Sequence, residues 1–123
     1  MPNAKTPTAL VLSDDPLAAA LVAAAIEHYG VRPVFPGAGE SPRDALRRLR
    51  PRVVLVDCEH GTACSESFFG PATMTGARII LYGAPELADD LRSLAAKHNL
   101  KSIVLPTDPE ALGRLLDEHR PDE

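Results

Sequence analysis

The stretch Val53-Val54-Leu55-Val56-Asp57 decides the fold class of this 123-residue chain. Its four apolar, mostly β-branched residues show no in–out alternation, which is typical of a strand covered on both faces in a parallel sheet. Four similar runs surround it: Ala9–Ser13, Val31–Phe35, Ala77–Tyr82 and Ser102–Leu105. The five runs start at positions 9, 31, 53, 77 and 102, so the spacings are 22, 22, 24 and 25 residues. Each spacing has room for a strand, a helix and two short loops, and the sequence therefore predicts five βα units.

The segments between these runs carry the signals of helices. An Asp or Ser followed by Pro is typical of an N-cap and the first helical residue, and this pair occurs at Asp15-Pro16, Ser41-Pro42 and Asp108-Pro109. Apolar stripes at helical spacing predict surface helices over Glu86–His98 and Glu110–His119.

Two further segments predict helices of a different kind. Pro16–Tyr29 is apolar almost all round and ends at Gly30, which predicts a deeply buried helix with a left-handed cap. Glu59–Gly76 contains three glycines and Pro71, which predicts a short or distorted third helix.

Pro33 helps to fix the order of the strands. Proline inside a strand is tolerated mainly at a sheet edge, so the second strand is expected at an edge. With right-handed crossovers this predicts a flavodoxin-like (βα)5 three-layer α/β sandwich whose parallel sheet has the order 2-1-3-4-5. We expect the domain over 9–119, an N-terminal tail over 1–8, and a C-terminal tail or the start of a linker over 120–123.

Composition narrows the functional classes. Lys and Arg number 13 against 17 Asp and Glu, and the net charge of −4 argues against nucleic-acid binding by this domain. The longest apolar run, Pro16–Ile26, is too short to cross a membrane, and the first seven residues do not resemble a signal peptide, which predicts a cytoplasmic location. Cys58 and Cys64 are too few for a disulfide framework, and their spacing around His60 fits no standard zinc pattern, so we expect reduced packing residues.

Acidic side chains follow the first and third strands. Ser13-Asp14-Asp15 ends the first strand and Asp57-Cys58-Glu59 ends the third, where the winding of a 2-1-3-4-5 sheet reverses. Converging carboxylates there could hold Mg²⁺ and let an anionic phosphate donor approach a carboxylate nucleophile. For Asp15, which precedes Pro16, a capping role is the better interpretation.

Four segments together resemble the receiver domain of two-component response regulators: LSDDP at 12–16, VVLVD at 53–57, IILYGA at 79–84 and SIVLP at 102–106. The resemblance spans residues 9–119. It implies that Asp57 is the phosphoacceptor candidate and that Asp14, Asp57 and Glu59 would form a weak Mg²⁺ site. It also implies departures, because the family's acidic pair, strand-four Thr or Ser, and strand-five Lys fall on Ser13, Gly83 and Leu105.

These departures predict a pseudo-receiver, a receiver fold that has lost residues of phosphotransfer and signals by protein–protein contact, without enzyme activity and with no cofactor or only weakly bound Mg²⁺. The expected partners are a histidine kinase or an output domain, together with a second copy through the face of the fourth and fifth helices. One alternative is a response regulator that a histidine kinase still phosphorylates on Asp57. Another is a haloacid-dehalogenase-like phosphatase, because Asp57 and Glu59 are spaced like that family's two acids, although there the motif opens the fold.

Overall fold

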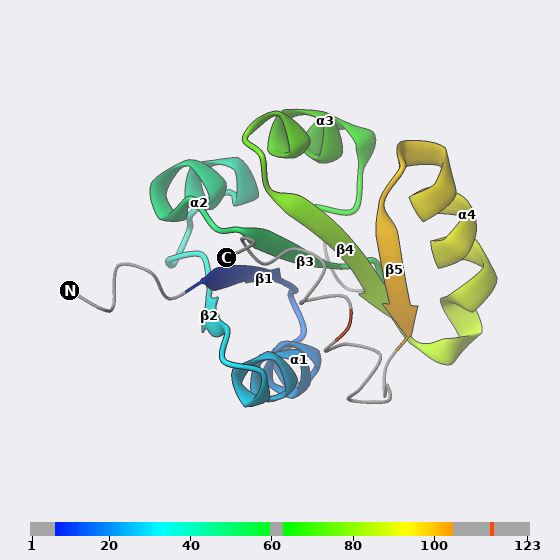
Figure 1. Ribbon diagram of the computed structural model, residues 1–123, viewed down its shortest axis with the longest axis horizontal. Helices are drawn as coiled ribbons and strands as arrows, with labels where there is room; N and C mark the ends of the chain where they lie inside the picture. Colours follow the sequence, from blue (N-terminus) through cyan, green and yellow to red (C-terminus); the bar gives the residue numbers. More distant parts are fainter. Residues whose placement is uncertain (1–6, 60–62, 105–113, 115–123) are drawn as a thin grey trace.

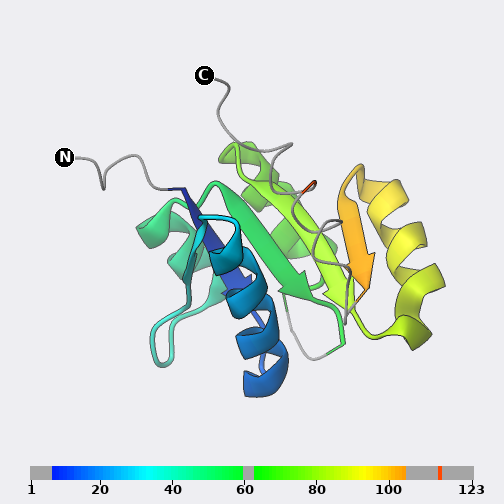
Figure 2. The same cartoon turned by 60° about the horizontal axis from the view of Figure 1, so that its bottom comes forward.

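The computed structural model describes residues 7–59, 63–104 and 114 of the chain. Five parallel strands form one sheet in the order β2-β1-β3-β4-β5, which confirms the predicted topology. Figure 2 shows the arrows of β3, β4 and β5 pointing the same way. Their bounds are β1 Thr8–Leu12, β2 Arg32–Val34, β3 Val53–Asp57, β4 Arg78–Gly83 and β5 Lys101–Val104.

Helices cover both faces of the sheet, which gives the predicted three layers (Figure 1). The described helices are α1 Pro16–His28, α2 Pro42–Leu49, α3 Glu66–Met74 and α4 Ala88–His98, with a short 3₁₀ turn, η2 Pro85–Leu87, before α4. Buried side chains of α2, α3 and α4 pack in one core cluster, whereas Val22 and Ile26 of α1 pack in the cluster on the other face. None of the described helices is long and apolar enough to span a membrane.

Two of the three predicted helix starts are confirmed. Asp15 Oδ1 accepts a hydrogen bond from the Leu17 amide at 3.2 Å, and Ser41 Oγ accepts one from the Asp44 amide at 3.1 Å. In both helices Pro is the first residue, where its missing N–H costs no helical hydrogen bond. The segments Asp108-Pro109 and Glu110–His119 lie outside the described residues, except for the helical Arg114.

The prediction of a deeply buried first helix is wrong. Only Val22 and Ile26 of α1 are buried, while the side chains of Leu17 and Leu21 are 68% and 56% exposed. The helix consists largely of alanine, which fits either environment, so an apolar composition all round did not indicate burial all round.

The third helix is short, as predicted, and Pro71 lies inside it. Proline has no N–H to donate to the carbonyl four residues earlier, which here belongs to Ser67. The guanidinium of Arg43 on α2 donates to this carbonyl at 3.0 Å instead. A side chain of the neighbouring helix thus supplies the partner that the proline removes.

Candidate functional site

Asp57 is the last residue of β3 and is 1% exposed. The Ser13 hydroxyl, which directly follows β1, donates to Asp57 Oδ2 at 2.6 Å, and the Glu59 amide donates to Asp57 Oδ1 at 2.8 Å. Ser13 Oγ also accepts a hydrogen bond from the Asp15 amide at 3.1 Å. The structure therefore brings the ends of β1 and β3 together, as the topology predicts, and each carboxylate oxygen of Asp57 accepts a hydrogen bond from within the chain.

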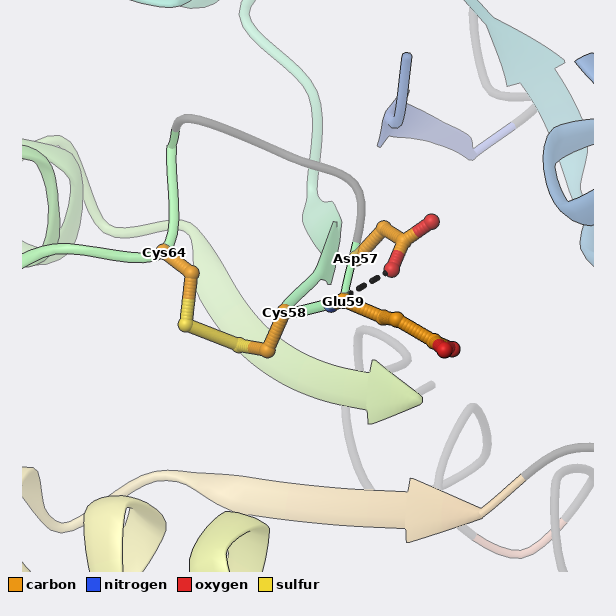
Figure 3. The surroundings of a disulfide bond; sticks show 4 residues. All are labelled: Asp57, Cys58, Glu59 and Cys64. Atoms are coloured by element: carbon orange, nitrogen blue, oxygen red, sulfur yellow. Dashed lines mark hydrogen bonds between the residues drawn. A yellow bond between two sulfur atoms is a disulfide. The ribbon is translucent and has the colours of Figure 1, made fainter. Parts of the chain in front are cut away.

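The other acidic residues of the predicted site are differently placed. Asp14 and Glu59 are exposed, and Asp14 lines a cavity of about 370 Å³ together with Ser13 and Ala63. Figure 3 shows the Asp57 and Glu59 side chains leaving the chain away from the disulfide. Across the described residues, no three His, Cys, Asp or Glu side chains lie close enough to hold a metal ion. Mg²⁺ is commonly held by one or two carboxylates together with waters and phosphate oxygens, so the weak site of Asp14, Asp57 and Glu59 stays a prediction.

The end of β4 has no room prepared for a side chain at Gly83. A Cβ atom built there would lie 3.2 Å from Leu87 Cδ1 and 3.3 Å from Leu91 Cδ1. Two leucines of the η2–α4 segment therefore crowd the space that a side chain at position 83 would enter, and they must shift by a few tenths of an ångström to admit one. Leu105, the position of the family's Lys, lies outside the described residues.

Tyr82 is a residue of the site that the sequence analysis did not single out. It pairs with Asp57 in the β3–β4 register and is 1% exposed. Burial, together with the negative charge of Asp57, raises the pKa of the Tyr82 phenol well above its usual value. The position opposite Asp57 was the signal that could have identified this residue.

Cys58 and Cys64 form a disulfide, so the prediction of reduced packing residues is wrong (Figure 3). Their Cα atoms lie 5.1 Å apart, within the range that the bond requires. Both residues are half-buried and also contact the core cluster beneath α2, α3 and α4. The cysteines no longer support a reducing compartment, and the cytoplasmic location stays a prediction.

The loop between β2 and α2 forms another wall of the cavity through Phe35, Gly37 and Glu40. Glu40 accepts two hydrogen bonds from the Arg48 guanidinium, at 2.7 and 2.8 Å, and one from the Gly37 amide at 2.8 Å. These bonds, the Arg48 bond most of all, lower the pKa of Glu40 to about 2. The acidic loop residue is therefore tied to α2 by a bidentate ion pair.

The α4 surface, where a second copy was expected to bind, carries charges that already have partners within the chain. Arg92 forms an ion pair with Asp89 of the same helix, and Lys97 forms one with Glu66 of α3 at 3.1 Å. The Lys97 ammonium lowers the pKa of the Glu66 carboxyl. These pairs are solvent-exposed, and they can exchange for pairs with another molecule at little cost.

Comparison with solved structures identifies the fold. The receiver domain of RstA from Klebsiella pneumoniae, solved in its BeF3-activated form, is 21% identical with a TM-score of 0.71, covering 94% of this chain and 99% of its own. A response regulator receiver protein from Burkholderia phymatum is 15% identical with a TM-score of 0.72, covering 91% of this chain and 93% of its own. The signal receiver domain of a modulated diguanylate cyclase from Desulfovibrio desulfuricans is 24% identical with a TM-score of 0.67, covering 92% of each chain. No protein-family model and no curated protein matches the sequence.

Proposed function

We propose that this receiver fold acts as a pseudo-receiver, which signals by protein–protein contact without aspartyl phosphorylation. The observation that carries the proposal is the hydrogen bonding of Asp57. Its two oxygens accept from the Ser13 hydroxyl and the Glu59 amide, and the side chain is 1% exposed. A carboxylate held in this way has little freedom to attack a phosphorus atom, which requires an exposed lone pair in line with the leaving group.

The surroundings of Asp57 support the same proposal. Phosphotransfer to a carboxylate builds negative charge, and preorganised cations or donors must stabilise it. The residue at position 13 contributes a hydroxyl in place of a carboxylate, and position 83 has no side chain, with leucines in the adjacent space. Position 105 carries Leu, which supplies no positive charge to a phosphoryl group.

The proposed partners are those of a signalling module: a histidine kinase, an output domain or a second copy of the chain. Exposed side chains of mixed charge on α4, including Asp89, Arg92 and Lys97, support a reversible contact that weakens as salt rises. Sedimentation of the protein at rising concentration, in low and high salt, tests whether two copies of the chain form a dimer. A monomer under every condition would contradict the proposed dimer.

Phosphorylation of Asp57 by a histidine kinase is the second candidate. It is favoured by one observation, the intact aspartate at the C-terminal end of β3 next to the cavity lined by Ser13 and Asp14. A transient loss of the Ser13 hydrogen bond would free the Oδ2 atom that a phosphoryl group needs.

The two candidates are separated by treating the protein with acetyl phosphate, or with beryllofluoride, in the presence of Mg²⁺. We expect no mass increase and no change in the amide NMR signals of residues 56–59. A variant in which Ser13→Asp, Gly83→Thr and Leu105→Lys restore the family's residues is the matched comparison, with Asp57→Asn as the control for modification elsewhere. A phosphoryl adduct on the unaltered protein that disappears with Asp57→Asn would establish the second candidate.

A further inference from the structure

We propose that the Cys58–Cys64 disulfide is a reversible thiol–disulfide exchange site for a protein dithiol, and that its redox state sets the geometry of the Asp57 edge of the sheet. The inference rests on the proposed function, because it supplies an input in place of phosphate. Its basis is the position of the two cysteines relative to Asp57, which Figure 3 shows.

In the sequence, Cys58 stands between Asp57 and Glu59, whose backbone amide donates a hydrogen bond to the Asp57 carboxylate. The Cys58 amide donates to the Tyr82 carbonyl at 2.9 Å, which continues the pairing of β3 with β4 beyond Asp57. The next amide, that of Glu59, donates to Asp57 Oδ1 at 2.8 Å. Any shift of Cys58 therefore moves both the strand end and a hydrogen-bond donor of the carboxylate.

Cys64 links the disulfide to the cavity beside Ser13 and to the start of α3. Ala63, which precedes it, is buried and lines the cavity with Ser13 and Asp14. Ser65, which follows it, accepts hydrogen bonds from the amides of Phe68 and Phe69 at the start of α3. The disulfide thus connects the turn that orients Asp57 directly to a helix whose phenylalanines are buried in the core.

The disulfide lies at the margin of the core cluster and not within it. Both cysteines are half-buried, in contrast to the neighbouring β3 residues, which are fully buried. A thiolate of the attacking dithiol bonds to one sulfur, and the other sulfur leaves as a thiolate. The second thiolate of the reductant then resolves the mixed disulfide. Cys58 and Cys64 together gain two electrons and two protons, and the dithiol becomes a disulfide.

Reduction removes the cross-link and leaves Cys58 and Cys64, which are separated by 6 positions in the sequence, joined by the backbone alone. By the loop-closure relation, a ring of this size restricts the open state by about fortyfold. We therefore expect amide hydrogen exchange at Glu59 and Phe68 to accelerate by up to about fortyfold on reduction, while exchange in β1 and α1 stays unchanged.

The experiment is a redox titration of the full chain in mixtures of reduced and oxidised dithiothreitol. Alkylation of free thiols followed by intact mass measures the reduced fraction, and hydrogen exchange measures the response of the Asp57 edge. We expect a reversible two-electron transition in the folded protein, with faster exchange at Glu59 and Phe68 that follows the reduced fraction. A Cys58→Ser/Cys64→Ser double variant is the matched control, and its exchange should not depend on the dithiothreitol ratio.

Two results would overturn the inference. One is thiols that become accessible only after denaturant is added, which would make the bond purely structural. The other is reduction in the folded state that changes exchange only at the cysteines themselves. Both comparisons use the unaltered chain, so a double variant that fails to fold does not affect them. Treating the same oxidised and reduced samples with acetyl phosphate and Mg²⁺ separates the two proposals: an Asp57 adduct contradicts the proposed function, whereas an exchange pattern indifferent to redox state contradicts only the inference.

Discussion

The hydrogen bond from Ser13 to Asp57 can be tested by removing the hydroxyl with Ser13→Ala. The substitution deletes the 2.6 Å bond to a carboxylate that is 1% exposed, and it also deletes the 3.1 Å bond that Ser13 Oγ accepts from the Asp15 amide. A hydrogen bond to a buried charged group contributes about 2 kcal/mol and a neutral one about 1 kcal/mol. We therefore expect the free energy of unfolding to fall by about 3 kcal/mol.

A double-mutant cycle isolates the part that belongs to the Ser13–Asp57 pair. Urea unfolding at pH 7 is measured for the unaltered protein, Ser13→Ala, Asp57→Ala and the double variant. In the Asp57→Ala background the Ser13 substitution should cost only the Asp15 bond, about 1 kcal/mol, so the coupling energy should be about 2 kcal/mol. A coupling energy below about 0.5 kcal/mol would refute the view that Ser13 holds the Asp57 carboxylate in solution.

Three further predictions concern the surroundings of the site. Gly83→Thr should lower the free energy of unfolding by about 1–3 kcal/mol because Leu87 and Leu91 must move, and Gly83→Ala should lower it by less. Urea unfolding of both variants measures the difference, and a Thr variant as stable as the unaltered protein would show that the leucines move aside without cost. Reducing the disulfide should lower the free energy of unfolding by about 2 kcal/mol, which lowers the melting temperature by about 8 °C for a chain of 123 residues. Thermal unfolding with and without reductant measures this change. If reductant lowered the melting temperature of the Cys58→Ser/Cys64→Ser variant equally, the effect could not be assigned to the disulfide. Because the pKa of Glu40 falls from 4.5 to about 2 on folding, its contribution to stability is present above pH 4.5 and is lost as the pH falls toward 2. Glu40→Gln should therefore lower the free energy of unfolding at pH 6 and not at pH 2, as measured by urea unfolding at both pH values. A difference between the two proteins that does not depend on pH would argue against the Glu40–Arg48 pair.

The sequence predicted the architecture because each local signal agreed with the others. Apolar runs without alternation, helix starts at Asp15-Pro16 and Ser41-Pro42, and an edge position for Pro33 all pointed to one parallel sheet with helices on both faces. The meeting of Ser13 with Asp57 follows from the same topology, because parallel strands place their C-terminal ends at one edge.

The features that the sequence did not predict depend on tertiary geometry. Cys58 and Cys64 pair because the backbone brings their Cα atoms to 5.1 Å, and their spacing alone does not determine that distance. The role of Arg43 depends on where α2 lies relative to the proline in α3. The exposure of Leu17 on α1 depends on which stripe of an alanine-rich helix meets the sheet, and composition does not specify this.

The leucines beside Gly83 make the residue type at position 83 depend on its neighbours in the core. A residue with a side-chain hydroxyl at position 83 meets Leu87 and Leu91 before either can be replaced, and shortening a leucine first opens a hole next to a glycine. Position 83 and the two leucines therefore form one packing unit, in which a side chain at position 83 requires a compensating shift of Leu87 and Leu91.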